Sequence, residues 1–500
     1  MRKRRYQGSI TIFLSLITVL FLAVICTVLE GIRIQGAKVR AAACLDMGLF
    51  SVFGEYDREL LSRYHVFFFD GSYRTGSFDV EKAEERLCFF MGQNNDLSHV
   101  SPGIDWFKVN NTETRVIQYF LATDEGGKAF LQQAALFMQG IPNTDGKSNQ
   151  IGVSQGEEIE NKIQIFRDLY QKLEYFWQTM NTSEKESYEI DPIEWIAGKR
   201  KGDVLQQVIP PSFSVSSGDV SQFDRVSERA CNEGTMEIPT GDVENLEESF
   251  LRYLFFTFGN AKERKAQEGL AYELEYLLEG QNSDEKNLRK VCEDLLEIRF
   301  ADNFLTVQKD QKQREKAEKM IMDWKEKADE TEKKESENVK EEDRQERVTQ
   351  EEIDIILLAC AYQESCLDLQ ILLQGGRVPV EKNVGQWKVT EIPFWQNDVK
   401  ILGAGEDTDG WTYQEYLQLL FEMRKVSDLP MKALDLVEWE LRSGDDTAYF
   451  RADCCIGGMT VETAWQIEPM FFRVTSAFLG TGYSKTEYEA KGSFCYEMEE

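Results

Sequence analysis

The first 42 residues, MRKRRYQGSITIFLSLITVLFLAVICTVLEGIRIQGAKVRAA (1–42), set the architecture of this chain. Residues 10–29 carry no charge, and as a helix they would be about 30 Å long, the thickness of the hydrocarbon core of a bilayer. A secretory signal has a shorter apolar stretch, roughly 7–15 residues, that ends at a small-residue cleavage site. Because this run is longer and ends in CTVLE (26–30), we predict a retained transmembrane helix over residues 10–30.

The charges around the run indicate its orientation. Residues 1–9 form a basic lead, and basic residues that flank a membrane helix stay on the cytoplasmic side. Everything from Glu30 onward would then be extracytoplasmic. We therefore expect a single-pass protein of the cell membrane with a cytoplasmic N-terminus and an extracytoplasmic body. The polar residues of the run can bond to carbonyls of their own helix: Thr11, Ser15, Thr18 and Thr27.

The helix is predicted to continue outward as a stalk. Apolar or small residues recur there every three or four positions, as on one face of a helix: Ile34, Ala37, Ala41, Leu45, Gly48, Val52, Tyr56 and Leu60. Small side chains let a second helix approach closely, so we assign membrane or stalk packing to four residues, Gly36, Ala37, Ala41 and Leu45. Alternatively, the stripe docks on the protein's own domain.

The composition is that of a folded, acidic protein. The chain has 500 residues, 42% hydrophobic and 12% aromatic, which is enough for two or three domains with their own cores. Its net charge of −31 repels phosphate backbones, so we expect no nucleic-acid partner. An acidic body suits a soluble domain outside the cell.

The expected fold class is α+β and helix-rich, a long N-terminal transmembrane and stalk helix followed by a mixed extracytoplasmic body. After the lead (1–9) and the membrane helix (10–30), we divide the chain by composition and periodicity. The divisions are a stalk helix with a first α+β region (31–180), a Ser-, Gly- and Pro-rich connector (181–244), a helical region (245–375) with a charged flexible insertion at about 329–349, and a C-terminal α+β region (376–500).

Within these regions several elements are predicted. The patterns indicate strands at 63–73, 449–455, 458–467 and 487–498, a strand, a Gly126–Gly127 break and a helix within 112–139, and a helix at 157–180. Thr412 and Glu415 spell a capping box that opens another helix. Residues 309–352 mix both signs of charge, which favours a helix to about Ala328 and then a flexible segment.

Motifs for chemistry are incomplete. GVSQG (152–156) spells a nucleophile elbow, but a polar loop precedes it and the two histidines, His65 and His99, lie upstream of Ser154. Residues 140–148 have one residue too many for a phosphate loop. Two histidines also leave little scope for a zinc-protease helix or an imidazole base.

Metal ligands are not indicated either. The acidic stretch 406–410 has Tyr416 where the twelfth position of a calcium loop needs Glu. The ten cysteines include no C-x-x-C pair, so we expect mostly buried free thiols, with room for a bridge or two. We therefore assign no catalytic, cofactor-binding or metal residues and expect no cofactor.

Longer stretches carry a family resemblance. They are GSITIFLSL (8–16), LEGIRIQGAKVRAA (29–42), VFGEYDRELLSRYHVFFFDGSY (52–73), ELEYLLEGQNSDEKNLRKVCEDLLEIRFADN (273–303), AYQESCLDLQILLQGGRVPV (361–380), TYQEYLQLLFEM (412–423) and FRADCCIGGMTVETAW (450–465). The chain resembles an uncharacterised, domain-of-unknown-function family of single-pass surface proteins of anaerobic Gram-positive bacteria, often encoded near Tad-type (tight adherence) pilus components. This resemblance implies an architecture and a context but no reaction.

The N-terminus also resembles TadE/TadG-like pseudopilins, which have a basic lead, a glycine just before the hydrophobic segment and a helix that runs outward. The resemblance implies Gly8 and Ser9 as a site for processing by a prepilin peptidase. One departure is that Phe13 stands where pilins usually carry a glutamate.

We therefore expect a membrane-anchored, non-catalytic extracytoplasmic component of a Tad-like pilus or cell-surface assembly. Its partners would be the lipid bilayer and, through the N-terminal helix, other pilus or secretion membrane proteins. The alternative is an anchored extracytoplasmic enzyme, a wall-polymer hydrolase, with a carboxylate site that no spacing in the sequence identifies.

Overall fold

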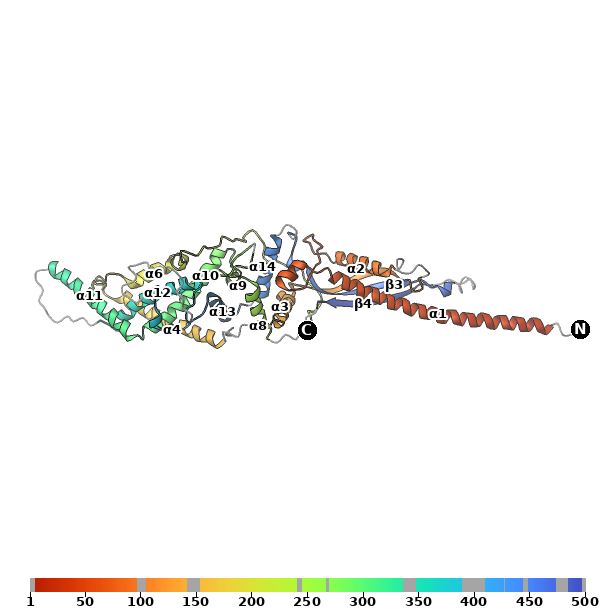
Figure 1. Cartoon of the computed structure of the whole chain (residues 1–500), viewed down its shortest axis with the longest axis horizontal. Coiled ribbons are helices and arrows are strands. Elements are labelled where there is room, and N and C mark those ends of the chain that lie inside the picture. The colour runs from red at the N-terminus through yellow and green to blue at the C-terminus, as the bar shows by residue number, and fades with distance from the viewer. Residues whose placement is uncertain are drawn as a thin grey trace. The chain divides into compact units, whose positions relative to one another are not determined.

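A computed structural model describes residues 5–96, 105–141, 153–240, 245–266, 269–335, 348–388, 410–426, 428–443, 448–473 and 484–496 (Figure 1). The chain divides into two compact units, and each is built from separate segments. Unit 1 comprises Met1–Pro142, Asp224–Phe256 and Pro430–Glu500, and unit 2 comprises Asn143–Phe223 and Thr257–Leu429. The helix-rich α+β class is confirmed.

Unit 1 combines a four-stranded sheet with helices. Its elements, in chain order, are α1 (Arg5–Phe53), the π-helical turn η1 (Leu60–Tyr64), β1 (Phe69–Asp70), α2 (Val80–Asn95), β2 (Asn110–Leu121), α3 (Asp124–Gln139), α8 (Leu246–Thr257), α14 (Leu429–Arg442), the 3₁₀ turn η3 (Ala452–Cys454), β3 (Cys455–Ile467) and β4 (Thr486–Cys495).

Strand β3 organises the sheet, because β1, β2 and β4 all pair with it in antiparallel fashion. β4 pairs along most of β3, from Thr486 opposite Ile467 to Cys495 opposite Gly458. The ring of Phe120 from β2 lies directly over Gly457 and Gly458, where a Cβ atom would come within 2.3 Å of it. Both glycines therefore let a large aromatic side chain fill the core beside the sheet.

The C-terminal part of α1 belongs to this core. It packs against α2, β3 and β4, and its buried side chains join those of the sheet in one apolar cluster. The helix ends at Phe53, so the predicted stripe leaves the helix before Tyr56 and Leu60. Gly54, a poor helix former, follows directly.

Several predicted elements of unit 1 are present in the structure. The strand, break and helix at 112–139 are confirmed as β2 and α3, with positive φ angles at Gly126 and Gly127. The strand at 458–467 is confirmed as part of β3. The strand at 487–498 is confirmed as β4 as far as Cys495, and residues 497–498 lie outside the described part.

Two strand predictions were wrong in extent. The strand at 63–73 shrinks to Phe69–Asp70, because η1 ends at Tyr64 and His65 follows in the left-handed conformation (φ 57°). Residues 449–454 form no strand: Ala452–Cys454 make the turn η3, and ion pairs to Arg229 and Arg451 hold the Asp453 side chain there.

Unit 2 is helical. Its elements are α4 (Val153–Thr179), α5 (Thr182–Lys185), α6 (Pro192–Lys201), α7 (Val204–Val208), α9 (Glu273–Glu279), α10 (Asp284–Val307), α11 (Gln311–Glu335), α12 (Gln350–Gln374), the 3₁₀ turn η2 (Val384–Gln386) and α13 (Tyr413–Arg424). The predicted helix at 157–180 is confirmed as α4, and the Thr412–Glu415 capping box at α13 is present. α11 runs on past Ala328, and residues 336–347 of the predicted insertion lie outside the described part.

Helix α12 is the centre of unit 2 and packs against α4, α6, α7, α10 and α11. It begins at a capping box of Thr349 and Glu352 and ends at Gly375, which has a φ of 94°. These are a usual start signal and a usual stop signal of a helix. Its 25 residues are apolar enough to cross a membrane, but 94% of its most apolar window is buried inside the protein. α12 is therefore a core helix.

Candidate functional site

The first part of α1 is an uncovered apolar surface. From Ile10 to Leu29 the large apolar side chains are 39–69% exposed, and Figure 1 shows this part of the helix, in red, running free of the rest of unit 1. Ser15, Thr18 and Thr27 donate hydrogen bonds to carbonyls three or four residues earlier at 2.8–2.9 Å, as predicted. The segment thus has the length and surface of a membrane anchor or a signal peptide.

Gly8 and Ser9 lie inside α1, which begins at Arg5. The backbone on both sides of the Gly8–Ser9 bond is therefore helical. Cleavage there stays a prediction.

Glu30 and Arg33, directly after the apolar run, form a buried pair. Glu30 is fully buried and accepts hydrogen bonds from Arg33 at 2.7 and 3.0 Å. It also accepts the backbone N–H groups of Met470 at 3.1 Å and Phe471 at 2.7 Å. Arg33 in turn donates to the carbonyls of Trp106, at 3.4 Å, and Glu468. We call this pair the α1 clamp, since it fastens two loop segments to the helix.

The four predicted packing residues face unit 1 itself. Ala37 and Ala41 are fully buried and Leu45 is 1% exposed, in the cluster that α1 shares with α2 and β4. Gly36 is covered by the ring of Phe107, which a Cβ atom would approach to 2.3 Å. Any further helix must therefore dock on α1 through residues other than these four.

α1 has further apolar residues that are exposed. Ile32, Val39, Met47 and Phe50 are 61%, 70%, 54% and 70% exposed. Their spacings of seven, eight and three residues, with exposed Ala43 between, place them along one side of the helix. We call these residues the outer stripe, and it extends the apolar surface of residues 10–29 beyond the clamp.

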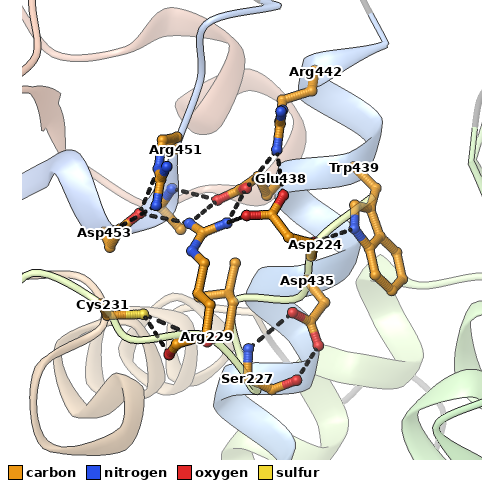
Figure 2. A network of polar contacts seen from close by, with 12 residues as sticks. Asp224, Ser227, Arg229, Cys231, Asp435, Glu438, Trp439, Arg442, Arg451 and Asp453 are labelled. Carbon is orange, nitrogen blue, oxygen red and sulfur yellow. Dashed lines mark hydrogen bonds and ion pairs between the residues drawn. The ribbon is translucent and has the colours of Figure 1, made fainter. Parts of the chain in front are cut away.

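Figure 2 shows a cluster of ion pairs around Arg229 in unit 1. The guanidinium bonds both oxygens of Glu438 at 2.6 and 2.7 Å and Asp453 at 2.5 Å. Glu438 and Asp453 are at most 1% exposed. Burial by itself raises the pKa of Asp453, but Arg451 and Arg229 outweigh it, and the pKa lies below its usual value.

The same cluster joins segments that are distant in the chain. Asp435 of α14 accepts from the Ser227 N–H at 3.0 Å and its hydroxyl at 2.6 Å, and Trp439 donates to the carbonyl of Asp224 at 3.1 Å. Since each carboxylate drawn in Figure 2 has a donor, the arrangement holds the segment from Asp224 onward against α14.

Unit 2 contains a second buried cluster. Asp368 of α12 accepts from Arg299 at 3.0 Å, Lys382 at 2.6 Å and Asn303 at 2.9 Å, and Lys382 also bonds Glu364. Burial opposes ionisation of Asp368, yet the two cations keep its pKa below the usual value. The ion-paired side chains are at most 3% exposed, so they are shielded from solvent.

Glu275 of α9 is a strongly perturbed carboxyl group. It is fully buried, and Oε1 accepts from the Ala261 N–H and the Tyr413 hydroxyl, both at 2.8 Å. Oε2 has no hydrogen-bond partner among the described residues. Burial raises the pKa of Glu275 to about 7. A raised pKa is a property of catalytic acids, but a group sealed from solvent cannot meet a polymer.

The remaining sequence candidates are fewer in the described part of the chain. His65 stacks on Phe137 at 4.0 Å, and burial lowers its pKa. Ser154 lies in the first turn of α4, while His99 and residues 142–150 and 406–409 lie outside the described part. Among the residues that are described, no group of three or more His, Cys, Asp or Glu could hold a metal ion.

The cysteines are as expected. All ten are free thiols, and six of them are buried. Cys88 on α2 is the exposed one, which makes it the most accessible thiol of the chain.

Sequence reasoning missed the clamp and both charge clusters. A signal for the clamp exists, because Glu30 and Arg33 stand three residues apart where the apolar run ends. A signal for the second cluster is Asp368 inside the apolar sequence CLDLQILL (366–373). Arg229 gave no signal, because its two buried partners, Glu438 and Asp453, come from segments more than 200 residues away.

Comparison with known families gave one match. A family of unknown function (DUF5702) matches residues 181–323 and 348–467, together more than half of the chain. No curated protein and no solved structure matches this chain. The matched residues include α12 and β3 but not α1.

Proposed function

The chain belongs to DUF5702, a family of unknown function, and we propose that it is a membrane-anchored, non-catalytic extracytoplasmic component of a Tad-like pilus or related cell-surface assembly. One observation carries the proposal. α1 is a single helix of 49 residues whose first part is uncovered and apolar and whose last part belongs to the core of unit 1.

Retention of the anchor is supported by the continuity of α1. A signal peptidase would cut near residues 26–30, within the helix and next to Glu30. That carboxylate is fully buried and holds two backbone amides, so the helix on its N-terminal side is part of a structured junction. The basic residues of the lead then keep the N-terminus cytoplasmic and place both units outside.

Participation in an assembly is supported by the outer stripe. Exposed apolar side chains along a helix are the usual contact surface for another amphipathic helix. Because the outer stripe continues from the apolar run, a partner helix that follows it would also enter the membrane. The resemblance of the N-terminus to pseudopilins agrees with a partner of this kind, either another pilin-like protein or a second copy.

An anchored wall-polymer hydrolase is the second candidate. It is favoured by Glu275, whose raised pKa of about 7 would suit a general acid. Complete burial of this residue weighs against the enzyme, so we prefer the non-catalytic assignment.

The test is site-specific crosslinking in membranes. A photo-reactive residue is placed at Phe50 on the outer stripe and, as a matched control, at Phe89 of α2, which is 50% exposed in the same unit. We expect the Phe50 probe, and not the Phe89 probe, to link to a pilus or secretion membrane protein or to a second copy. Equal or absent crosslinking at the two positions, with the protein recovered in the membrane fraction, would contradict the assembly role.

A further inference from the structure

We propose that Trp106, Phe107 and Phe472 form a lipid-contacting collar where α1 leaves the membrane. The collar would rest in the outer headgroup layer and seat unit 1 on the bilayer. The inference rests on the proposed function, since it requires that residues 10–29 span the membrane.

The first observation is a concentration of exposed aromatic side chains. Trp106 is 49% exposed, Phe107 42% and Phe472 38%. In the described part of the chain, only nine large apolar side chains outside α1 are this exposed, and these are three of them. They come from two segments more than 350 residues apart, so their gathering is a product of the fold.

The second observation is how these segments are fixed. The clamp residue Arg33 holds the carbonyl of Trp106 at 3.4 Å, and Glu30 holds the N–H of Phe471, the neighbour of Phe472, at 2.7 Å. The rings of Trp106 and Phe471 then contact each other, with centroids 5.8 Å apart.

Two further contacts fix Phe107. Its ring lies against Gly36, and the preceding Asp105 pairs with Arg40 at 2.7 Å. All the attachment points on α1 therefore fall between Glu30 and Arg40, within three turns of the helix.

The position of those turns relative to a membrane follows from helix geometry. Residues 10–29 fill the hydrocarbon core, and Glu30 to Gly36 rise at most about 10 Å beyond it. The headgroup layer on each side is roughly 5–8 Å thick. The collar is therefore level with the boundary between lipid and water, the region that Trp and other aromatic side chains prefer.

A lipid contact explains these residues better than a protein contact does. The bilayer is necessarily adjacent to any residue held beside this part of α1, whereas a protein partner would have to be added. The body carries a strong negative charge, so the collar would bind through its aromatic side chains and not through attraction to anionic lipids. A neutral phosphatidylcholine bilayer should be sufficient.

The experiment measures the depth of nitroxide spin labels on the full chain in phosphatidylcholine vesicles. Labels are attached at Trp106→Cys and, separately, Phe472→Cys, with Val19→Cys as the reference for the membrane interior and Phe89→Cys as the aqueous control. Phe89 lies on α2, whose Leu87 and Met91 contact Gly48, about 18 Å further along α1 than Gly36. The accessible native thiols are first replaced by serine or alanine: Cys26, Cys88, Cys231 and Cys495.

Each label is scored by its collisions with oxygen, which concentrates in lipid, relative to a water-soluble nickel chelate. We expect the Trp106 and Phe472 labels to show ratios between those of Val19 and Phe89, with a loss of nickel collisions when the protein moves from detergent to vesicles. Ratios equal to that of Phe89, with the Val19 label in lipid, would overturn the collar and leave the anchor intact.

Two other outcomes also decide the question. An aqueous Val19 label would remove the membrane anchor and the collar with it. Labels at Trp106 and Phe472 that are aqueous in vesicles but shielded from both reagents in native membranes would assign this surface to a protein partner instead of lipid.

Discussion

Asp368 and Glu275 are both fully buried carboxyl groups, and their neighbours give them opposite properties. Asp368 accepts from two cations, Arg299 and Lys382, which keep it ionised. The partners of Glu275 are a neutral amide and a neutral hydroxyl, and burial raises its pKa to about 7. Charge pairing therefore separates a carboxyl group whose pKa is lowered from one whose pKa is raised to about 7.

The first prediction concerns Glu275→Gln. The pKa of a free glutamate is about 4.3, so between there and pH 7 the folded protein keeps a proton that the unfolded chain has released. Wild-type stability should therefore fall as pH rises through this window. The Gln variant keeps an acceptor for Ala261 and Tyr413 without the charge, and it should be more stable than wild type at pH 8, by on the order of 3 kcal/mol.

Urea unfolding of both proteins at pH 5 and pH 8 measures this difference. Asp368→Asn is the contrasting variant. Its folded-state pKa is lowered, so the substitution should destabilise at both pH values, because Arg299 and Lys382 lose their partner. A Glu275→Gln variant less stable than wild type at pH 8 would contradict the account of this site.

The second prediction concerns Arg229→Met. The substitution leaves Glu438 and Asp453 buried without their main cation, and breaking a buried pair in this way costs about 3–5 kcal/mol. Arg115→Met is the control, since Arg115 is 68% exposed and pairs with an exposed Glu113. It should change stability little. Thermal unfolding of the two variants compares them, and similar melting temperatures would show that the Figure 2 cluster is not a structural tie.

For Asp453 the pH dependence has the opposite sign to that of Glu275. Its pKa in the folded state lies below the unfolded value, so its contribution is complete above about pH 4. That contribution is lost as pH falls through the lower, folded-state pKa. The stability difference between wild type and Arg229→Met should therefore narrow in strong acid.

At the scale of elements, periodicity in the sequence predicted those helices and strands whose burial follows a simple repeat. α1, α4, β3 and β4 were found this way, because one face of each is apolar and local sequence decides the period. The sequence FFF (67–69) reads as a strand by composition, but only Phe69 and Asp70 reach a partner, β3. Residues 449–454 failed for a similar reason, since the ion pairs of Asp453 with distant residues fix a turn there.

The third prediction concerns the clamp on α1 and Glu30→Ala. The substitution leaves Arg33, which is 5% exposed, without the Glu30 carboxylate. It also removes the Glu30 oxygens that accept the N–H groups of Met470 and Phe471. We expect faster hydrogen exchange at those two amides, because their hydrogen bonds to Glu30 are lost. The amide of Val461 in the middle of β3 should keep its protection.

Asp46→Ala supplies the control for the clamp, since Asp46 is an exposed acid on the same helix. Hydrogen exchange followed by mass spectrometry resolves the peptides concerned. Unchanged exchange at Met470 and Phe471 in Glu30→Ala would mean that the loop is held without the clamp. The collar would then lose one of its attachments to α1.

At the scale of the whole molecule, the chain forms two units, and each combines segments that are not adjacent in the sequence. The division into units could therefore not be predicted from composition along the chain. Composition reports contiguous regions, whereas unit 1 recruits Asp224–Phe256 and Pro430–Glu500 to a core begun by α1. The stretch from 224 to 240 has the polar composition of a connector. Its polar side chains nevertheless hold it in unit 1, because they bind residues more than 200 positions away in the sequence. The pairs of Arg229 with Glu438 and Asp453 were unpredictable for the same reason.

The fourth prediction concerns the orientation of the molecule and uses the exposed thiol of Cys88. In intact cells that express the full chain, a membrane-impermeant maleimide should label Cys88 from outside. Cys88→Ser should abolish that labelling. A Gln7→Cys thiol in the cytoplasmic lead, in the Cys88→Ser background, should react only after the cells are made permeable.

The central claim is that α1 is a retained anchor with both units outside. The most direct test labels Cys88 in cells before and after permeabilisation, and then washes the isolated membranes at alkaline pH. The account predicts full-length protein in the washed membranes, with Cys88 labelled in intact cells and no further increase on permeabilisation. Release of the protein by the wash, or labelling of Cys88 only in permeabilised cells, would contradict it.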